Sequence, residues 1–391
     1  MSAAAAALLP RRRRPRRTRR SSSLVSALVI AVALSSLSGC KTDGETDPPD
    51  KTGETGETGD EALPEQDPLD KALSLLEREQ PQEALEVIDG ALASGDNPKQ
   101  HELHFARGVA LATLGRQDEA VLAYQEALKL KPDFFAAHNA LGAVALDKQD
   151  IDGAIAAFQA ALQAKPDFGD AHYNLGRALI AKGDFEGASK ALEEALRLVP
   201  EDVDALFALA QLELKRGELD KAIEHAAAAA KLKPDDPTVR FSLGKMLMRA
   251  EKFPAAVVEF QLAYKAHPDA PNVRQWLGRS LVAAGRADEA MPHLEALAAA
   301  LPDQAIVWVD YADGLAAQGK LDGDDGALAK LDKAFSLDPK LVAGHLRKIE
   351  ILTRQSRCKP AKRAFKDLKK IEPPAAAIEL AQASVASCGK I

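Results

Sequence analysis

Residues 135–168, FAAHNALGAVALDKQDIDGAIAAFQAALQAKPDF, form one unit of the pattern that decides the fold. Apolar side chains recur every three or four positions in two segments of about a dozen residues, which is typical of amphipathic helices. A short polar turn separates the segments. Pro166 follows the second segment, where proline cannot continue the hydrogen-bond ladder of a helix. The unit is therefore predicted to fold as a helix, a turn and a second helix.

The same unit recurs every 34 residues. Its reference position is a small residue in the first helix, at Gly108, Gly142, Gly176, Ala210, Gly244 and Gly278. Twelve residues later stand Ala120, Ala154, Ala188, Ala222, Ala256 and Ala290, and another small or apolar position follows at Ala127, Ala161, Ala195, Ala229, Ala263 and Leu297. The units end at Pro132, Pro166, Pro200, Pro234, Pro268 and Pro302. Small residues at these positions indicate where the two helices approach each other most closely.

This spacing resembles the tetratricopeptide repeat, and six successive units in register carry the resemblance. Each helix pair leaves an apolar face open that the next pair covers, so the repeats stack into a solenoid. The resemblance implies an all-α fold, a right-handed superhelical solenoid of about nine helix-turn-helix units with a C-terminal capping helix. The expected parts are a divergent first unit at 67–100, six regular repeats at 101–304, two divergent repeats at 305–374, and the capping helix with the C-terminus at 375–391.

The N-terminal 39 residues have the composition of a secretory signal. Residues 11–20 contain eight arginines, and residues 24–37 are apolar or small and uncharged. That run is shorter than the roughly 20 residues a spanning helix needs. At its end, Leu37-Ser38-Gly39-Cys40 resembles a bacterial lipobox, which implies cleavage before Cys40 and covalent lipid on that residue. The alternative is an uncleaved anchor with an incidental Cys40.

Residues 40–66 predict a lipidated, disordered acidic linker. The segment from 41 to 66 has nine acidic residues, two lysines and almost no large apolar side chain. Lys41 lies where enteric inner-membrane lipoproteins carry aspartate, so the resemblance favours an outer-membrane lipoprotein that faces the periplasm. Without the signal arginines the chain has 43 basic and 58 acidic residues. This acidic balance argues against nucleic acid as a partner.

Two cysteines remain after the lipid site. Cys358 falls in the turn of the last helix pair and Cys388 ends the capping helix. An antiparallel capping helix would bring its end back to that turn, which predicts a disulfide in an oxidising compartment. Such a bond closes a loop of about 30 residues and contributes on the order of 3 kcal/mol in the chain-entropy account. Two separate thiols are the alternative.

No residues with the pattern of a catalytic or metal site stand out, so the chain is predicted not to be an enzyme and to need no cofactor beyond the lipid. Four histidines lie four residues before the reference position of their repeats, at His104, His138, His172 and His345. One repeat separates each from the next equivalent position, so they favour helix packing over metal binding. The turn from Asp322 to Gly326 lacks the glutamate that an EF-hand requires at its twelfth position, where Lys333 stands.

The resemblance also implies which residues line the concave groove: those three before, one after, and four and five after the reference position. The first set is Phe105, Asn139, Tyr173, Phe207, Phe241 and Gln275. The second is Val109, Ala143, Arg177, Gln211, Lys245 and Arg279, and the third includes Leu146, Asp147, Ile180, Leu214, Lys215, Met248 and Arg249. The predicted peptide-binding groove is the whole first set with Arg177, Gln211, Lys215, Lys245, Arg249 and Arg279.

Aromatic faces beside cations suit an extended peptide with an acidic segment or a terminal carboxylate. In the alternative, the aromatic rings pack between helices and the cations are merely solvated. The predicted function is a non-enzymatic, lipid-anchored scaffold that binds envelope proteins as an assembly factor. An accessory lipoprotein that activates a cell-wall enzyme, and a pilot lipoprotein for a type IV pilus or secretion pore, are the alternative hypotheses.

Overall fold

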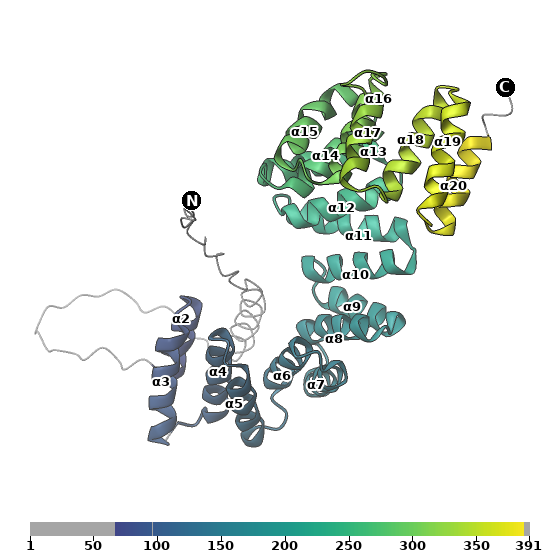
Figure 1. Cartoon of the computed structure of the whole chain (residues 1–391). Helices are drawn as coiled ribbons and strands as arrows, with labels where there is room; N and C mark the ends of the chain where they lie inside the picture. Colours follow the sequence, from purple (N-terminus) through teal and green to yellow (C-terminus); the bar gives the residue numbers. More distant parts are fainter. Residues whose placement is uncertain (1–66, 96, 387–391) are drawn as a thin grey trace, which may run out of the picture. The chain divides into compact units, whose positions relative to one another are not determined.

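The computed structural model describes residues 67–95 and 97–386. The signal, Cys40, the acidic linker and Cys388 lie outside the described residues, so the predictions made for them are not tested by the structure. Within the described part the chain forms 19 helices and no strand. These helices make nine antiparallel pairs and one further helix at the C-terminus, which confirms the predicted all-α tetratricopeptide solenoid (Figure 1).

The described part of the chain divides into two compact units, which are separated between Val199 and Pro200. The first unit contains α2 (Pro68–Glu77), α3 (Pro81–Ser94), α4 (Gln100–Thr113), α5 (Gln117–Leu130), α6 (Phe135–Asp147), α7 (Ile151–Ala164), α8 (Gly169–Lys182) and α9 (Phe185–Leu198). The second unit contains α10 (Val203–Arg216), α11 (Leu219–Leu232), α12 (Pro237–Arg249), α13 (Phe253–Ala266), α14 (Pro271–Ala283), α15 (Ala287–Ala300), α16 (Ala305–Ala317), α17 (Ala327–Leu337), α18 (Val342–Arg354), α19 (Cys358–Lys370) and α20 (Ala375–Ala386).

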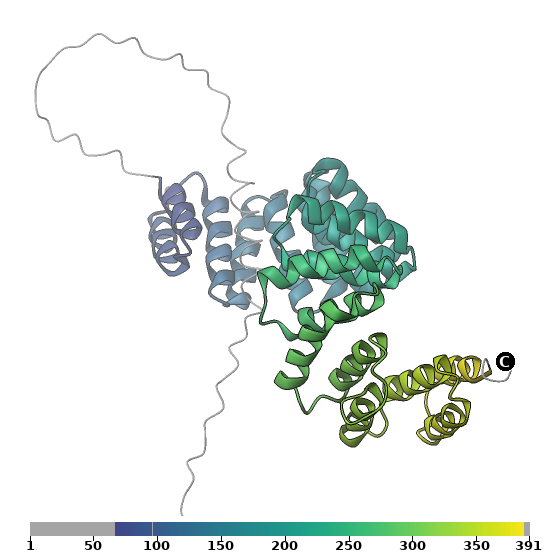
Figure 2. The same ribbon diagram turned by 90° about the horizontal axis from the view of Figure 1, so that it is seen from above.

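Within each unit, consecutive helices pack side by side, and Figure 2 shows the same pairing from above. The last helix, α20, packs against both α18 and α19. It therefore covers the face of the last pair that no further repeat would cover, as expected of a capping helix.

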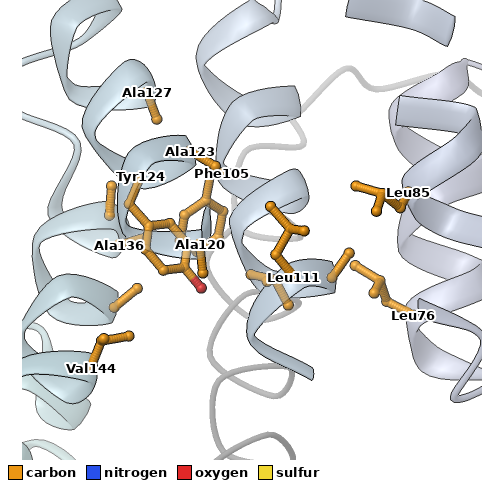
Figure 3. Packing of buried hydrophobic residues seen from close by; sticks show 14 of the residues in the cluster. Leu76, Leu85, Phe105, Leu111, Ala120, Ala123, Tyr124, Ala127, Ala136 and Val144 are labelled. Carbon is orange, nitrogen blue, oxygen red and sulfur yellow. The ribbon is translucent and has the colours of Figure 1, made fainter. Parts of the chain in front are cut away.

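The reference glycine lies where the two helices of a pair touch. A Cβ atom on Gly142 would lie 2.5 Å from the ring of Phe158, and one on Gly108 would lie 2.4 Å from the ring of Tyr124. Gly176, Gly244 and Gly278 meet the side chain sixteen residues later in the same way. Figure 3 shows the ring of Tyr124, from α5, beside that of Phe105, from α4, in the core of the first unit. The predicted close approach is confirmed, and its partner is the residue sixteen positions on.

A second recurring contact fastens the turns between repeats. The side chain four residues before the reference position makes a hydrogen bond to a proline carbonyl. That proline lies six residues before the bonding side chain. The contact is made by the ring nitrogens of His138 and His172 at 2.9 Å and of His345 at 3.0 Å. Arg240, Arg274 and Trp308 donate to the equivalent carbonyls at 2.9 Å. These histidines therefore tie turns in place.

Candidate functional site

A hollow of the second unit lies along the first helices of three successive repeats. It has a volume of about 660 Å³, and α14, α16 and α18 supply most of its lining. These three helices contact one another across the repeats, since α14 packs on α16 and α16 on α18. We call this hollow the α14–α18 cavity. Its apolar lining includes Met248, Phe253, Val282, Ile306, Val309, Leu321 and Ile351, and its charged lining consists of Arg279, Asp310, Asp313, Arg347, Glu350 and Arg354.

Asp310 lies at the centre of a hydrogen-bonded group in this cavity. The Arg279 guanidinium donates from Nε to Asp310 Oδ1 at 2.7 Å. The Gln275 amide donates to Oδ2 at 2.6 Å. Only 4 % of the Asp310 side chain is exposed, and this burial raises its pKa although Arg279 opposes the rise. The carboxylate and the guanidinium therefore hold each other in place on neighbouring repeats.

Asp313 lies one turn further along α16 and faces Arg347 of α18. Arg347 Nε lies 2.5 Å from Asp313 Oδ1, and Arg347 also donates to Glu350 at 2.6 Å. Burial raises the pKa of Asp313 to about 7, against the opposing charge of Arg347. Glu350 pairs in turn with Arg354 at 2.6 Å. Desolvation thus outweighs the ion pair, and Asp313 titrates near neutral pH.

One spacing explains these contacts. The residue one after the reference position of a repeat meets the residue two before that of the next repeat. Lys245 Nζ lies 5.7 Å from the centre of the Trp276 ring. The pair Arg279 and Asp310 and the pair Asp313 and Arg347 repeat this contact. The arginine comes first in the sequence in the pair of Arg279 and Asp310, whereas the aspartate comes first in the pair of Asp313 and Arg347. In both pairs, a positive charge in the α14–α18 cavity is matched by a carboxylate.

In the first unit, two of the predicted groove residues lie in the packed core instead of facing a groove. The prediction that Phe105 faces a ligand is wrong, because its ring is 1 % exposed and packs on Tyr124 and Phe134 at centroid distances of 5.6 and 5.2 Å. Asn139 is also buried, and its side-chain oxygen accepts a hydrogen bond from Asn174 at 3.1 Å. Both residues therefore contribute to packing.

Tyr173 and Arg177 keep the predicted combination of aromatic ring and cation. The Arg177 guanidinium lies 5.6 Å from the centre of the half-buried Tyr173 ring, and Arg177 itself is exposed. Of the other predicted lining residues, Val109 is buried, Ala143, Leu146 and Ile180 are half-buried, and Asp147 is exposed. Burial raises the pKa of Asp147, with Arg177 opposing.

In the second unit, the predicted groove residues divide between packing and exposure. Phe207 is half-buried, and Phe241 is half-buried with its ring 5.7 Å from Phe260 and 6.5 Å from Trp276. Gln275 and Arg279 are engaged by Asp310. The exposed members are Gln211, Lys215, Lys245 and Arg249. None of these three cations is ion-paired with another described residue.

Sequence reasoning missed Trp276, Asp310, Asp313 and Arg347. The first two and Arg347 stand two residues before the reference position, which was not among the positions considered. Asp313 stands one after it in a divergent repeat to which the groove positions were not extended. Applying the position two before the reference residue to every repeat, and the position one after it to the divergent repeats as well, would have found them.

The remaining polar candidates form structural contacts. In the turn from Asp322 to Gly326, Asp322 pairs with Arg357 at 2.8 Å and Asp325 with Lys330 at 3.0 Å. Among the described residues, no three His, Cys, Asp or Glu side chains converge to hold a metal ion. No helix within those residues has the length and apolar character needed to cross a membrane. Cys358 is disulfide-bonded; its pairing with Cys388 stays a prediction.

Comparisons with known proteins agree with the architecture. Residues 54–305 match the family described as Cilia and flagella-associated protein 70 C-terminal domain, and residues 277–340 match a tetratricopeptide repeat family. A comparison with curated proteins gave no match.

Solved structures with a similar fold include Pseudomonas aeruginosa pilF, with 19% identity, a TM-score of 0.48, and coverage of 55% of this chain and 95% of that one. YrrB, a TPR protein with an unusual peptide-binding site, is 20% identical with a TM-score of 0.44, covering 48% of this chain and 95% of that one. A tetratricopeptide repeat protein from Parabacteroides merdae is 19% identical with a TM-score of 0.47, covering 67% of this chain and 98% of that one.

Proposed function

The chain belongs to the tetratricopeptide repeat family defined by the Cilia and flagella-associated protein 70 C-terminal domain, and we propose that it is a non-enzymatic scaffold for other proteins. In this proposal lipid on Cys40 anchors it in a bacterial envelope, at the outer membrane facing the periplasm. The tether of residues 41–66 lets the repeats reach envelope partners and support their assembly. The single observation that carries the binding role is the α14–α18 cavity.

The cavity is suited to side chains of an extended segment. Its volume lies within the range of roughly 300–1,000 Å³ typical of ligand sites. One part of its wall is apolar and the other carries charges that are already paired, so an inserted side chain gains most from apolar contact. The bound segment therefore places apolar residues here.

In this proposal the exposed cations of α12, next to the cavity, recognise the acidic groups of the bound segment. Lys245 and Arg249 stand one turn apart on that helix, both exposed, and Met248 between them lines the cavity. Lys215 adds an exposed cation on α10. An acidic group or terminal carboxylate of the bound segment gains charge-assisted hydrogen bonds from these side chains. This leaves the predicted partner unchanged but removes Arg279 from the predicted binding residues, because it is already paired with Asp310.

In-cell crosslinking with mass spectrometry tests the proposal. The groove variant carries Lys245→Glu and Arg249→Glu. The matched control carries Lys231→Glu and Lys233→Glu, two exposed lysines at the end of α11 that give the same change in net charge. Native and control proteins should capture the same envelope partner, and the groove variant should lose it. Capture of that partner by a folded groove variant would reject the site.

The anchor is tested separately. Cys40→Ala should abolish labelling by a palmitate analogue and release the protein from the membrane fraction, because the lipid is predicted to be attached at that sulfur and at the amine exposed by cleavage. Continued labelling of the variant would show that Cys40 is not the acylated residue. This outcome would leave the binding proposal for the cavity standing, since that proposal depends only on the repeats.

A further inference from the structure

Helix α19 carries a concentrated basic face in an otherwise acidic chain. Residues 357–370 hold seven lysines and arginines and one acid, Asp367, whereas the whole chain has a formal net charge of −7. At 100° per residue, six of the cations fall within an arc of about 120° and a length of about 16 Å. All six are exposed: Lys359, Lys362, Arg363, Lys366, Lys369 and Lys370. The opposite side of the helix buries Ala361, Ala364 and Leu368.

This arrangement costs stability in the absence of a ligand. The cations follow one another at three- and four-residue spacings, at which like charges on a helix repel. Lys359 lies in the first turn, at the positive end of the helix dipole. Only Lys370 forms an ion pair with a described carboxylate, that of Asp367 at 2.8 Å. Packing of α19 against its neighbours needs only the buried residues. Apart from the Lys370 pair and a contact of Lys369 Nζ with the Phe365 ring at 4.5 Å, no described contact engages the cations of the basic face.

A second hollow opens beside this face. It has a volume of about 450 Å³ and lies between α17, α18 and α19. Leu328, Phe335 and Leu352 form its apolar part. Lys359 and Arg363 of the basic face line its edge, and the other nearby cations are already engaged, Lys348 by Asp332 and Arg357 by Asp322. Unpaired positive charge and an apolar recess are therefore side by side.

We propose that the face of α19, with the recess between α17, α18 and α19, binds an acidic peptide segment of a partner protein that inserts one apolar side chain into the recess. Unpaired cations in a row attract successive carboxylates, and the recess provides for a side chain that a purely electrostatic site would not accommodate. A recess of this volume favours a peptide over a flat anionic membrane surface. The site shares no residue with the α14–α18 cavity, so either proposal can fail without the other.

Fluorescence anisotropy with the mature chain tests this site. The probe is a labelled peptide with four glutamates around a central leucine. Two matched peptides replace the leucine by serine or the glutamates by glutamines. We expect Lys359→Glu with Arg363→Glu to weaken binding of the first peptide by about tenfold or more, because charged hydrogen bonds are lost. Lys231→Glu with Lys233→Glu, on α11, should leave binding unchanged. Affinity should also fall as NaCl rises from about 50 to about 500 mM.

Three results would overturn the proposal. Equal binding by the α19 and α11 variants would place the peptide elsewhere. Equal affinity for the leucine and serine peptides would show that the recess is not used. Binding to vesicles of equal parts phosphatidylcholine and phosphatidylserine, lost in the α19 variant and without peptide binding by the native chain, would assign the face to a membrane surface. Since the substituted side chains are exposed, circular dichroism should show native helix content in every variant.

Discussion

At the scale of single residues, the reference position and the residue sixteen positions later share a fixed space. Gly142 faces Phe158, Gly108 faces Tyr124, and Gly176 faces Leu192. Where the reference residue is Ala210, the later residue is Ala226, and both are fully buried. A larger residue at the first position is thus matched by a smaller one at the second. The two side chains together set how closely the helices of a pair approach.

Gly142→Ala should therefore destabilise the protein by about 1–2 kcal/mol. A methyl group there would lie 2.5 Å from the fully buried ring of Phe158. Overpacking of this kind costs about 1–3 kcal/mol and exceeds the gain of up to about 1 kcal/mol from alanine in a helix. Urea unfolding followed by circular dichroism measures the change.

Gly90→Ala is the matched control for this substitution. Gly90 is an exposed residue of α3 with no atom within 4 Å of its added Cβ. Only helix propensity then acts, so the control should be stabilised by about 0.5–1 kcal/mol. If both variants lost stability to the same extent, close packing at Gly142 would not be the cause.

Asp313 makes stability depend on pH. Its pKa in the folded protein is raised from 3.8 to about 7 by burial. The folded state then binds this proton more tightly than the unfolded chain, so the free energy of unfolding falls as the pH rises from about 4 to 7. In Asp313→Asn this contribution should be absent, and the profile between pH 5.5 and 7.5 should become flatter. Urea titrations across that window measure it; an unchanged slope in the variant would contradict the assignment.

At the scale of helices and turns, one hydrogen bond defines how successive pairs are joined. Histidine, arginine and tryptophan all serve, because each reaches the proline carbonyl with a ring or guanidinium N–H. What matters is a donor of sufficient length four residues before the reference position. Among the described repeats the bond is absent at Leu206, whose side chain cannot donate to the carbonyl of Pro200, and at His104, whose ring makes no described hydrogen bond to the carbonyl of Pro98.

His138→Phe should destabilise the first unit by about 0.5–1.5 kcal/mol, the usual contribution of one hydrogen bond. Phenylalanine keeps the ring while it removes the bond to the Pro132 carbonyl. His267→Phe, at an exposed residue after α13, is a control for the same chemical change and should shift stability by less than about 0.5 kcal/mol. Equal losses in thermal or urea unfolding would mean that the bond to Pro132 is not what stabilises the turn.

The fold was predictable from the sequence because its determinants are local and periodic. Gly142 and Ala154 indicate where the two helices of a pair approach closely, and Pro166 indicates where the second helix ends. The candidate site was less predictable because it depends on contacts between repeats. Phe105 has the spacing of a groove residue, but Tyr124 and Phe134 cover its ring. The insertion before α17 displaces the register of the following repeat by three residues. The pairing of Asp313 with Arg347 was therefore not evident from the regular spacing.

At the scale of the whole molecule, interactions run from one pair to the next. In each unit, helices contact mainly their neighbours in the sequence and the equivalent helix of the next repeat. The stability of such an array is roughly the sum of the stabilities of its repeats and of the interfaces between adjacent repeats. A local defect should therefore stay local, in contrast to a globular domain with one shared core.

Hydrogen exchange of the Gly142→Ala protein tests this expectation. Amide exchange should speed up in α6 and α7, which contain the strained contact, and to a lesser extent in α5 and α8, which pack on them. It should remain unchanged in α14, α16 and α18, because those helices belong to the other compact unit. Local opening of this kind follows from nearest-neighbour stabilisation. An equal increase in exchange from α2 to α20 would instead show that the repeats unfold as one cooperative block, and binding at the α14–α18 cavity would then depend on every repeat.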